Sequence, residues 1–183
     1  MLRIGLVLAL AAAVGLTARV QVARALDCEP AGRALAVRAS IAGTDRLTVS
    51  YAVVNRTGAG LRWISIGSGE RERTRLVPQQ TPAVLGAPPG WRGAVVYPEE
   101  SSFVHVWWET DDPAAALATG GATSGFVVSV AGPAAVTPGL RDADGRAVRP
   151  IDFGSLPFTA GGGSRCWWGQ VEPAAPPAGR RAR

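Results

Sequence analysis

Short apolar runs separated by glycine and proline constrain the fold of this 183-residue chain more than any other feature. The clearest run is Arg46–Asn55, which alternates strictly and places one set of apolar side chains on a single face: Leu47, Val49, Tyr51 and Val53. The 23 glycines and 14 prolines fall mostly between such runs. Strands spaced about 8–12 residues apart with turn residues between them favour one antiparallel β-sandwich of about seven to nine strands.

The expected strands are spread along most of the chain. They cover 34–41, Arg46–Asn55, 61–66, 94–97, 102–110, 125–130 and 147–153, and a last one runs through Cys166. The glycine-rich turn at 58–60 predicts that the second and third runs form a hairpin. Residues 113–119 suggest a single helical turn that begins at proline.

The first 25 residues have the pattern of a secretory signal peptide. Arg3 supplies a positive charge, and residues 4–16 form an apolar run that is shorter than the roughly 20 residues needed to span a bilayer. Ala23 and Ala25 then give the small-x-small pattern of a cleavage site. We therefore expect residues 1–25 to be removed and the remaining chain to be exported, to a periplasmic, cell-surface or secreted location.

Two cysteines lie near the ends of the expected mature chain. In an exported protein, Cys28 and Cys166 predict one disulfide bond. The alternative is lipidation of Cys28, although Asp27 stands where a lipoprotein signal has a small residue. The sequence leaves both alternatives open.

Charge argues against a nucleic-acid partner. Removal of the signal peptide takes away Arg3, Arg19 and Arg24, which leaves 16 arginines against 14 acids, a net charge of about +2. The chain has no lysine, and its abundance of alanine and glycine is typical of a bacterial protein from a GC-rich genome. The expected domain covers 26–171 and has no membrane span, and the Pro/Ala/Arg-rich segment 172–183 is expected to be disordered.

Several short motifs resemble a loosely defined group of uncharacterised exported bacterial domains. They lie between residues 48 and 130 and are Y-x-V-x-N-x-T-G at 51–58, W-I-S-I-G at 63–67, P-P-G-W at 88–91, the pair Trp107-Trp108, and T-G-G-A-T-S-G-F at 119–126. Thr119 departs from the pattern, which usually has proline there. The resemblance implies an immunoglobulin-like β-sandwich and no particular activity.

The six tryptophans give the best indication of function. Neighbouring residues of a strand point to opposite faces, so one member each of Trp107-Trp108 and Trp167-Trp168 should face away from the core. Exposed indole rings can bind sugar rings or a protein partner. Trp107, Trp108, Trp167 and Trp168 are therefore the candidate ligand-binding residues, while the more ordinary interpretation places Trp63, Trp91 and the inward members in the core.

A hydrolase is the alternative function. It would use the single histidine, His105, or the acids Glu109, Asp111 and Asp112 at the end of the same strand. No serine lies in a G-x-S-x-G motif, and a lone histidine cannot form a multi-histidine metal site.

No cofactor or metal is expected. The segment 142–145 has only part of the pattern of a calcium loop, and a tight turn at Asp144-Gly145 explains it better. The sequence thus favours an exported, non-catalytic binding or structural module with a glycan or surface-protein ligand. Assembly by strand addition at an open sheet edge, with 172–183 as a tether, is a third possibility.

Overall fold

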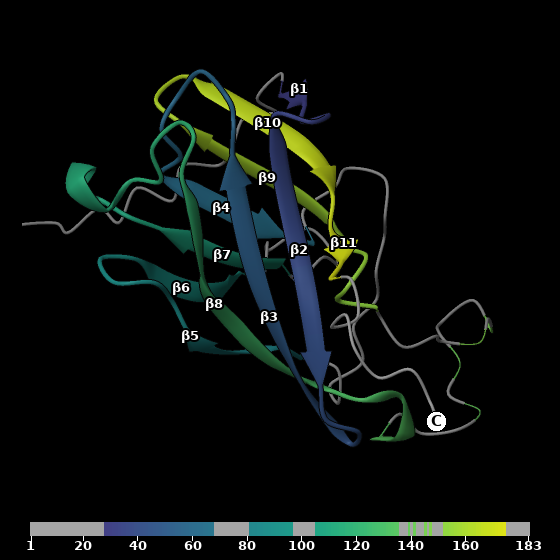
Figure 1. Cartoon of the computed structure of the whole chain (residues 1–183). Helices are drawn as coiled ribbons and strands as arrows, with labels where there is room; N and C mark the ends of the chain where they lie inside the picture. Colours follow the sequence, from purple (N-terminus) through teal and green to yellow (C-terminus); the bar gives the residue numbers. More distant parts are fainter. Residues whose placement is uncertain are drawn as a thin grey trace, which may run out of the picture.

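Two β-sheets lie face to face across a shared apolar core (Figure 1). The computed structural model describes residues 28–67, 81–96, 105–135 and 152–174, together with 139, 141, 145 and 147. The strands are β1 (Glu29–Pro30), β2 (Leu35–Ala42), β3 (Arg46–Asn55), β4 (Trp63–Ile66), β5 (Ala83–Gly86), β6 (Arg92–Val96), β7 (His105–Glu109), β8 (Ala122–Ala131), β9 (Pro157–Gly162), β10 (Arg165–Gln170) and β11 (Glu172–Pro173). Single 3-10 turns occupy η2 (Pro113–Ala115) and η3 (Pro133–Ala135).

The strand order is that of an immunoglobulin-like sandwich. One sheet has the order β1-β10-β9-β4-β7-β6 and the other β11-β2-β3-β8-β5. With β2 as strand A, the series β2-β3-β8-β5 corresponds to A-B-E-D and β10-β9-β4 to G-F-C, and β7 and β6 extend the second sheet beyond strand C. The predicted fold class is confirmed.

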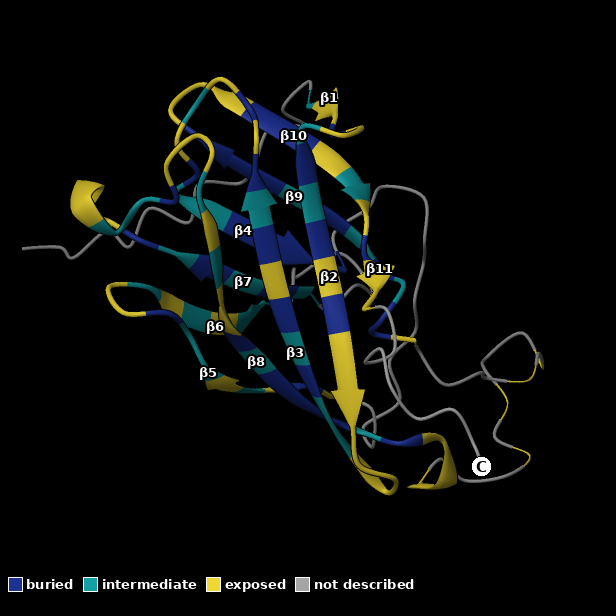
Figure 2. Cartoon of the chain, in the orientation of Figure 1, coloured by how far each residue is buried: buried dark blue, intermediate teal, exposed yellow. Residues whose placement is uncertain are grey.

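Alternating side chains of both sheets fill the core. Along β3, Val49, Tyr51 and Val53 are buried, as the alternation predicted, and the neighbouring positions are more exposed (Figure 2). Trp108 has an exposed fraction of 0% and contacts Tyr51 and Phe126 edge-on, with ring centroids 5.9 and 5.4 Å apart. Its indole Nε1 donates a 3.1 Å hydrogen bond to the Gly86 carbonyl of β5, which joins the two sheets through a buried side chain.

The predicted hairpin between β3 and β4 is wrong. These strands belong to opposite sheets, and the chain crosses between the layers at residues 56–62. Asn55 holds the crossing: its Nδ2 donates to the carbonyl oxygens of Ala59, Leu117 and Ala118 at 2.9, 2.9 and 3.2 Å, while its Oδ1 accepts from both the backbone N–H and the hydroxyl of Thr57. The connection is therefore not the predicted tight turn. It is a corner between the two sheets that the hydrogen bonds of Asn55 to Leu117 and Ala118 hold in place.

The Cys28–Cys166 disulfide is present and confirms the predicted pairing. The Cys28 sulfur is thereby bonded to Cys166, whose strand β10 lies parallel to β1. At the other end, Glu172 and Pro173 pair with β2, so this part of the expected disordered segment is ordered in β11. Residues 175–183, like the predicted signal peptide, lie outside the described residues.

Two further local predictions meet different outcomes. The single helical turn expected at 113–119 is the 3-10 turn η2, which the Asp112 side chain caps by accepting from the N–H of Ala114. The strand expected at 147–153 is not formed at its described positions, since Ala147 makes only an isolated bridge to Arg141 and 153–155 form a turn. Among the described residues, no helix is long and apolar enough to cross a membrane.

Candidate ligand-binding face

The two tryptophan pairs divide between the core and the outer face of the six-stranded sheet, as strand alternation predicted. Trp108 and Trp167 point inward, with exposed fractions of 0% and 3%. They are therefore core residues, and a ligand on the outer face would not contact them. Trp168 is 52% exposed, and Trp107 is half-buried on the same outer face.

Trp63 was expected in the core but lies on the outer face. Ile64 and Ile66 of β4 are buried in the core, so Trp63 and Ser65 point the opposite way. The Trp63 ring stacks on Trp107, with centroids 4.8 Å apart and an interplanar angle of 9°. A neighbouring glycine makes room for it, because a Cβ at Gly161 would lie 2.8 Å from Trp63 Cζ2. The alternation of Ile64 and Ile66 in the sequence could have predicted that Trp63 faces outward.

Cross-strand pairing places two hydroxyl residues between Trp107 and Trp168. Trp107 pairs with Ser65, Ser65 with Thr159, and Thr159 with Trp168, which forms one row across β7, β4, β9 and β10. The Ser65 side chain is buried, and its Oγ has no hydrogen-bond partner among the described residues. An unpaired buried hydroxyl costs about 1–3 kcal/mol, so this position is unusual for a residue that serves packing alone.

His105 lies beside the tryptophan stack. Its ring contacts Trp107 edge-on at a centroid distance of 6.4 Å, and its cross-strand partner on β6 is Val96. Burial lowers the pKa of His105, because the charged imidazolium loses solvation. These apolar surroundings favour a packing role over the catalytic role considered from the sequence.

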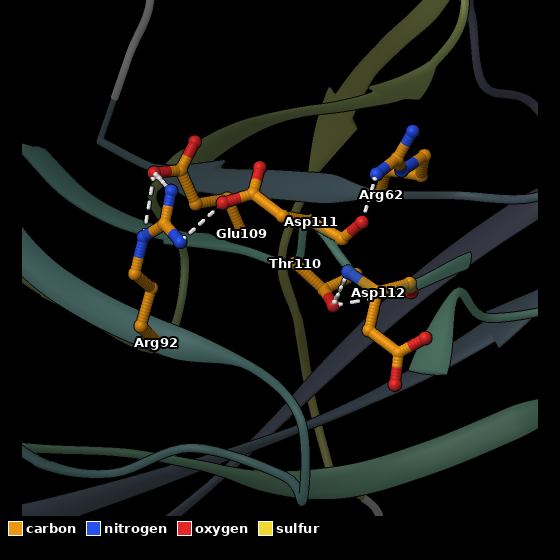
Figure 3. A network of polar contacts seen from close by, with 6 residues as sticks. All are labelled: Arg62, Arg92, Glu109, Thr110, Asp111 and Asp112. Atoms are coloured by element: carbon orange, nitrogen blue, oxygen red, sulfur yellow. Dashed lines mark hydrogen bonds and ion pairs between the residues drawn. The ribbon is translucent and has the colours of Figure 1, made fainter. Parts of the chain in front are cut away.

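The acids considered for hydrolysis are engaged with arginine or with the backbone (Figure 3). Arg92 binds Asp111 and Glu109, with N–O distances of 2.5 and 2.8 Å, and the hydrogen bonds that it donates to Asp111 and then to Glu109 raise the pKa of the guanidinium. Arg62 donates to the Asp111 carbonyl at 2.6 Å, and Asp112 caps η2. These carboxylates therefore have structural partners and lie at an exposed rim next to Trp63.

The described residues contain no cluster of three or more histidines, cysteines or acids that could hold a metal ion. The candidate calcium segment 142–145 lies outside the described residues except for Gly145. Nothing in the described part of the chain therefore adds to the incomplete calcium pattern of that segment.

Comparison with known proteins gives only distant likenesses. Neither a protein-family profile nor a curated protein sequence matches the chain. Among solved structures, an uncharacterized protein from Nocardia farcinica with an immunoglobulin-like fold is 16% identical with a TM-score of 0.45, and covers 80% of this chain and 89% of its own. A protein described as a unique CBM of Ruminiclostridium thermocellum is 10% identical with a TM-score of 0.37, and covers 78% and 99%. Neither likeness carries functional weight.

Proposed function

We propose that this chain is an exported, non-catalytic binding module that takes a glycan on the outer face of its six-stranded sheet. The observation that carries the proposal is the placement of Trp63, Trp107 and Trp168 together on one face, outside a core that is already filled with other aromatic rings. Trp168 is one of three large apolar side chains that the described residues leave exposed. An indole ring offers a rigid apolar surface with a polar N–H, which suits the alternating C–H and hydroxyl groups of a sugar.

Polar groups around the stack support a glycan over a purely apolar ligand. Arg92 and Glu109 are cross-strand partners at the edge of the face, and Glu109 pairs on its other side with Trp63. Ligand sites commonly combine aromatic surfaces with a few placed polar groups that fix orientation. A sugar hydroxyl can both donate to Glu109 and accept from Arg92.

Export is part of the proposal and rests on two observations. Residues 1–25 have the sequence pattern of a signal peptide, and Cys28 is bonded to Cys166. Disulfide bonds form and persist in oxidising compartments such as the periplasm or the extracellular space. Detection of mature protein beginning near Leu26 outside the cytoplasm tests this part directly.

Binding is tested with the purified, disulfide-bonded protein and insoluble cellulose, chitin, xylan and peptidoglycan. Retention on one matrix that Trp107→Ala and Trp168→Ala each weaken supports the proposal. Leu85→Ala is the matched control, because Leu85 is 59% exposed but belongs to β5 of the other sheet. Near-ultraviolet circular dichroism shows whether each variant keeps its native packing.

Failure to bind any matrix overturns the glycan proposal. Retention that is equal in the parent and both tryptophan variants also overturns it, because the ligand would then lie elsewhere. In either case the outer face would be examined for a surface-protein partner, which is the remaining use of exposed tryptophan at a binding surface.

A further inference from the structure

We infer that the ligand is an extended oligosaccharide that crosses the strands from Trp107 to Trp168, and not a single sugar. This inference rests on the proposed glycan-binding function and adds the size and direction of the ligand. It is carried by the register of four neighbouring strands together with the unpaired hydroxyl of Ser65.

The distance between the two tryptophans sets the size of the ligand. Trp107 on β7 and Trp168 on β10 are three inter-strand steps apart, which corresponds to about 14 Å at roughly 4.8 Å per step. One pyranose ring is too small to contact both indoles at that separation. A chain of several sugars running perpendicular to the strands reaches both.

The row between the tryptophans suits a chain of hydroxylated rings. Its two middle positions, Ser65 and Thr159, carry small side chains with hydroxyl groups. The row continues to Ala94 on β6, which is exposed and pairs with Trp107. Within the described residues, the row therefore ends on a small exposed side chain at the edge strand β6.

Ser65 gives the row a hydroxyl that has no hydrogen-bond partner in the described part of the chain. Its Oγ is buried, so a ligand reaches it only when the side chains above it move aside, and such rotamer changes are common on binding. The Ser65 hydroxyl would then exchange a hydrogen bond with a sugar hydroxyl. If Ser65 binds the ligand, its replacement will lower ligand affinity without lowering protein stability. If Ser65 is purely structural, the two properties will not respond separately.

The test measures affinity by calorimetry for oligosaccharides of one to six sugars, taken from whichever polymer the matrix experiment identifies. We expect no measurable binding of the monosaccharide, rising affinity until the chain spans both indoles, and a plateau beyond that length. Trp168→Ala should weaken the longest oligosaccharides about tenfold or more and leave the shortest bound oligosaccharide unchanged. Leu85→Ala should match the parent at every length.

Ser65→Ala provides a second readout. It should keep or raise the thermal stability of the protein, since it removes an unsatisfied buried hydroxyl, and yet weaken the longer oligosaccharides several-fold. Affinity that is independent of chain length, or an equal effect of Trp168→Ala at all lengths, overturns the extended site while leaving the glycan-binding proposal intact. Absence of binding to any glycan overturns the proposed function itself.

Discussion

At the scale of single residues, the Asn55 side chain joins two segments that are far apart in the sequence at one corner of the sandwich. The segment Asn55-Arg56-Thr57 has the form of a glycosylation sequon, but the Asn55 amide is buried and makes hydrogen bonds to three carbonyl oxygens. Backbone hydrogen bonds between Asn55 and residues 120 and 121 tie the same corner to the start of β8. The motifs at 51–58 and 119–126 therefore meet in space.

Replacement of Asn55 by alanine should destabilise the protein by about 3 kcal/mol or more, because it leaves several buried polar groups without partners. Urea unfolding followed by tryptophan fluorescence measures this loss. The matched control is Thr57→Ser, which keeps the hydroxyl that donates to Asn55 and should change stability little. A loss below about 1 kcal/mol for Asn55→Ala would show that the corner is held by backbone contacts alone.

The lowered pKa of His105 predicts that stability depends on pH. Its pKa is lowered in the folded state by burial, so the unfolded chain, with an ordinary histidine pKa of about 6.5, binds the proton more tightly. Stability should therefore fall as the pH drops below about 6.5 and level off below the folded-state pKa. Unfolding free energies at pH 7.5 and 5.5 should differ more for the parent than for His105→Gln, and equal differences would exclude this role of His105.

At the scale of elements, β5, β6 and β7 meet around Trp108. Gly93 on β6 lies directly against this indole, and an added Cβ there would lie 2.5 Å from Trp108 Cδ1 and 2.9 Å from Val84 Cγ1. Because Trp108 is fixed by its hydrogen bond to Gly86, it has little freedom to move away. The absence of a side chain at Gly93 is thus what allows one indole to join the two sheets.

Gly93→Ala should cost about 1–3 kcal/mol of stability and shift the near-ultraviolet circular dichroism, because it overpacks a rigid site. Gly58→Ala is the control, since a Cβ there would contact only the flexible end of Arg165 at 3.5 Å. If both variants unfold at the same denaturant concentration, the contact at Gly93 relaxes without displacing Trp108.

Local sequence patterns predicted the strands better than they predicted which strands are neighbours. Alternation in β3 and in the tryptophan pairs correctly assigned inward and outward faces, because that period is a property of the extended backbone. The β3–β4 hairpin was wrong because the connection is decided by Asn55 reaching residues 117 and 118, more than 60 positions away. The expected burial of Trp63 was wrong because the alternation of Ile64 and Ile66, which are buried, turns Trp63 to the outer face.

At the scale of the whole molecule, the disulfide closes almost the entire domain into one loop. Cys28 and Cys166 are 138 positions apart, and the chain-entropy relation gives a stabilisation of about 5 kcal/mol for a loop of that length, an upper bound in practice. The paired variant Cys28→Ser with Cys166→Ser should therefore lose up to about 5 kcal/mol. Reduction of the parent should lower its midpoint to that of the paired variant, and an unchanged midpoint would contradict the entropic contribution.

The same bond decides how the domain responds to mechanical load. Tension applied between Cys28 and the chain beyond β11 would pass through the two sulfur atoms, because they form the shortest covalent path between those points. Residues 29–165, which include the described strands β1 to β9, would lie off this covalent path, so β10 and β11 are the strands that would be peeled from their neighbours β9 and β2. The row from Trp107 to Trp168 would then be loaded at its Trp168 end alone, so a pull along the chain would reach the exposed indole before it disturbed the rest of the outer face.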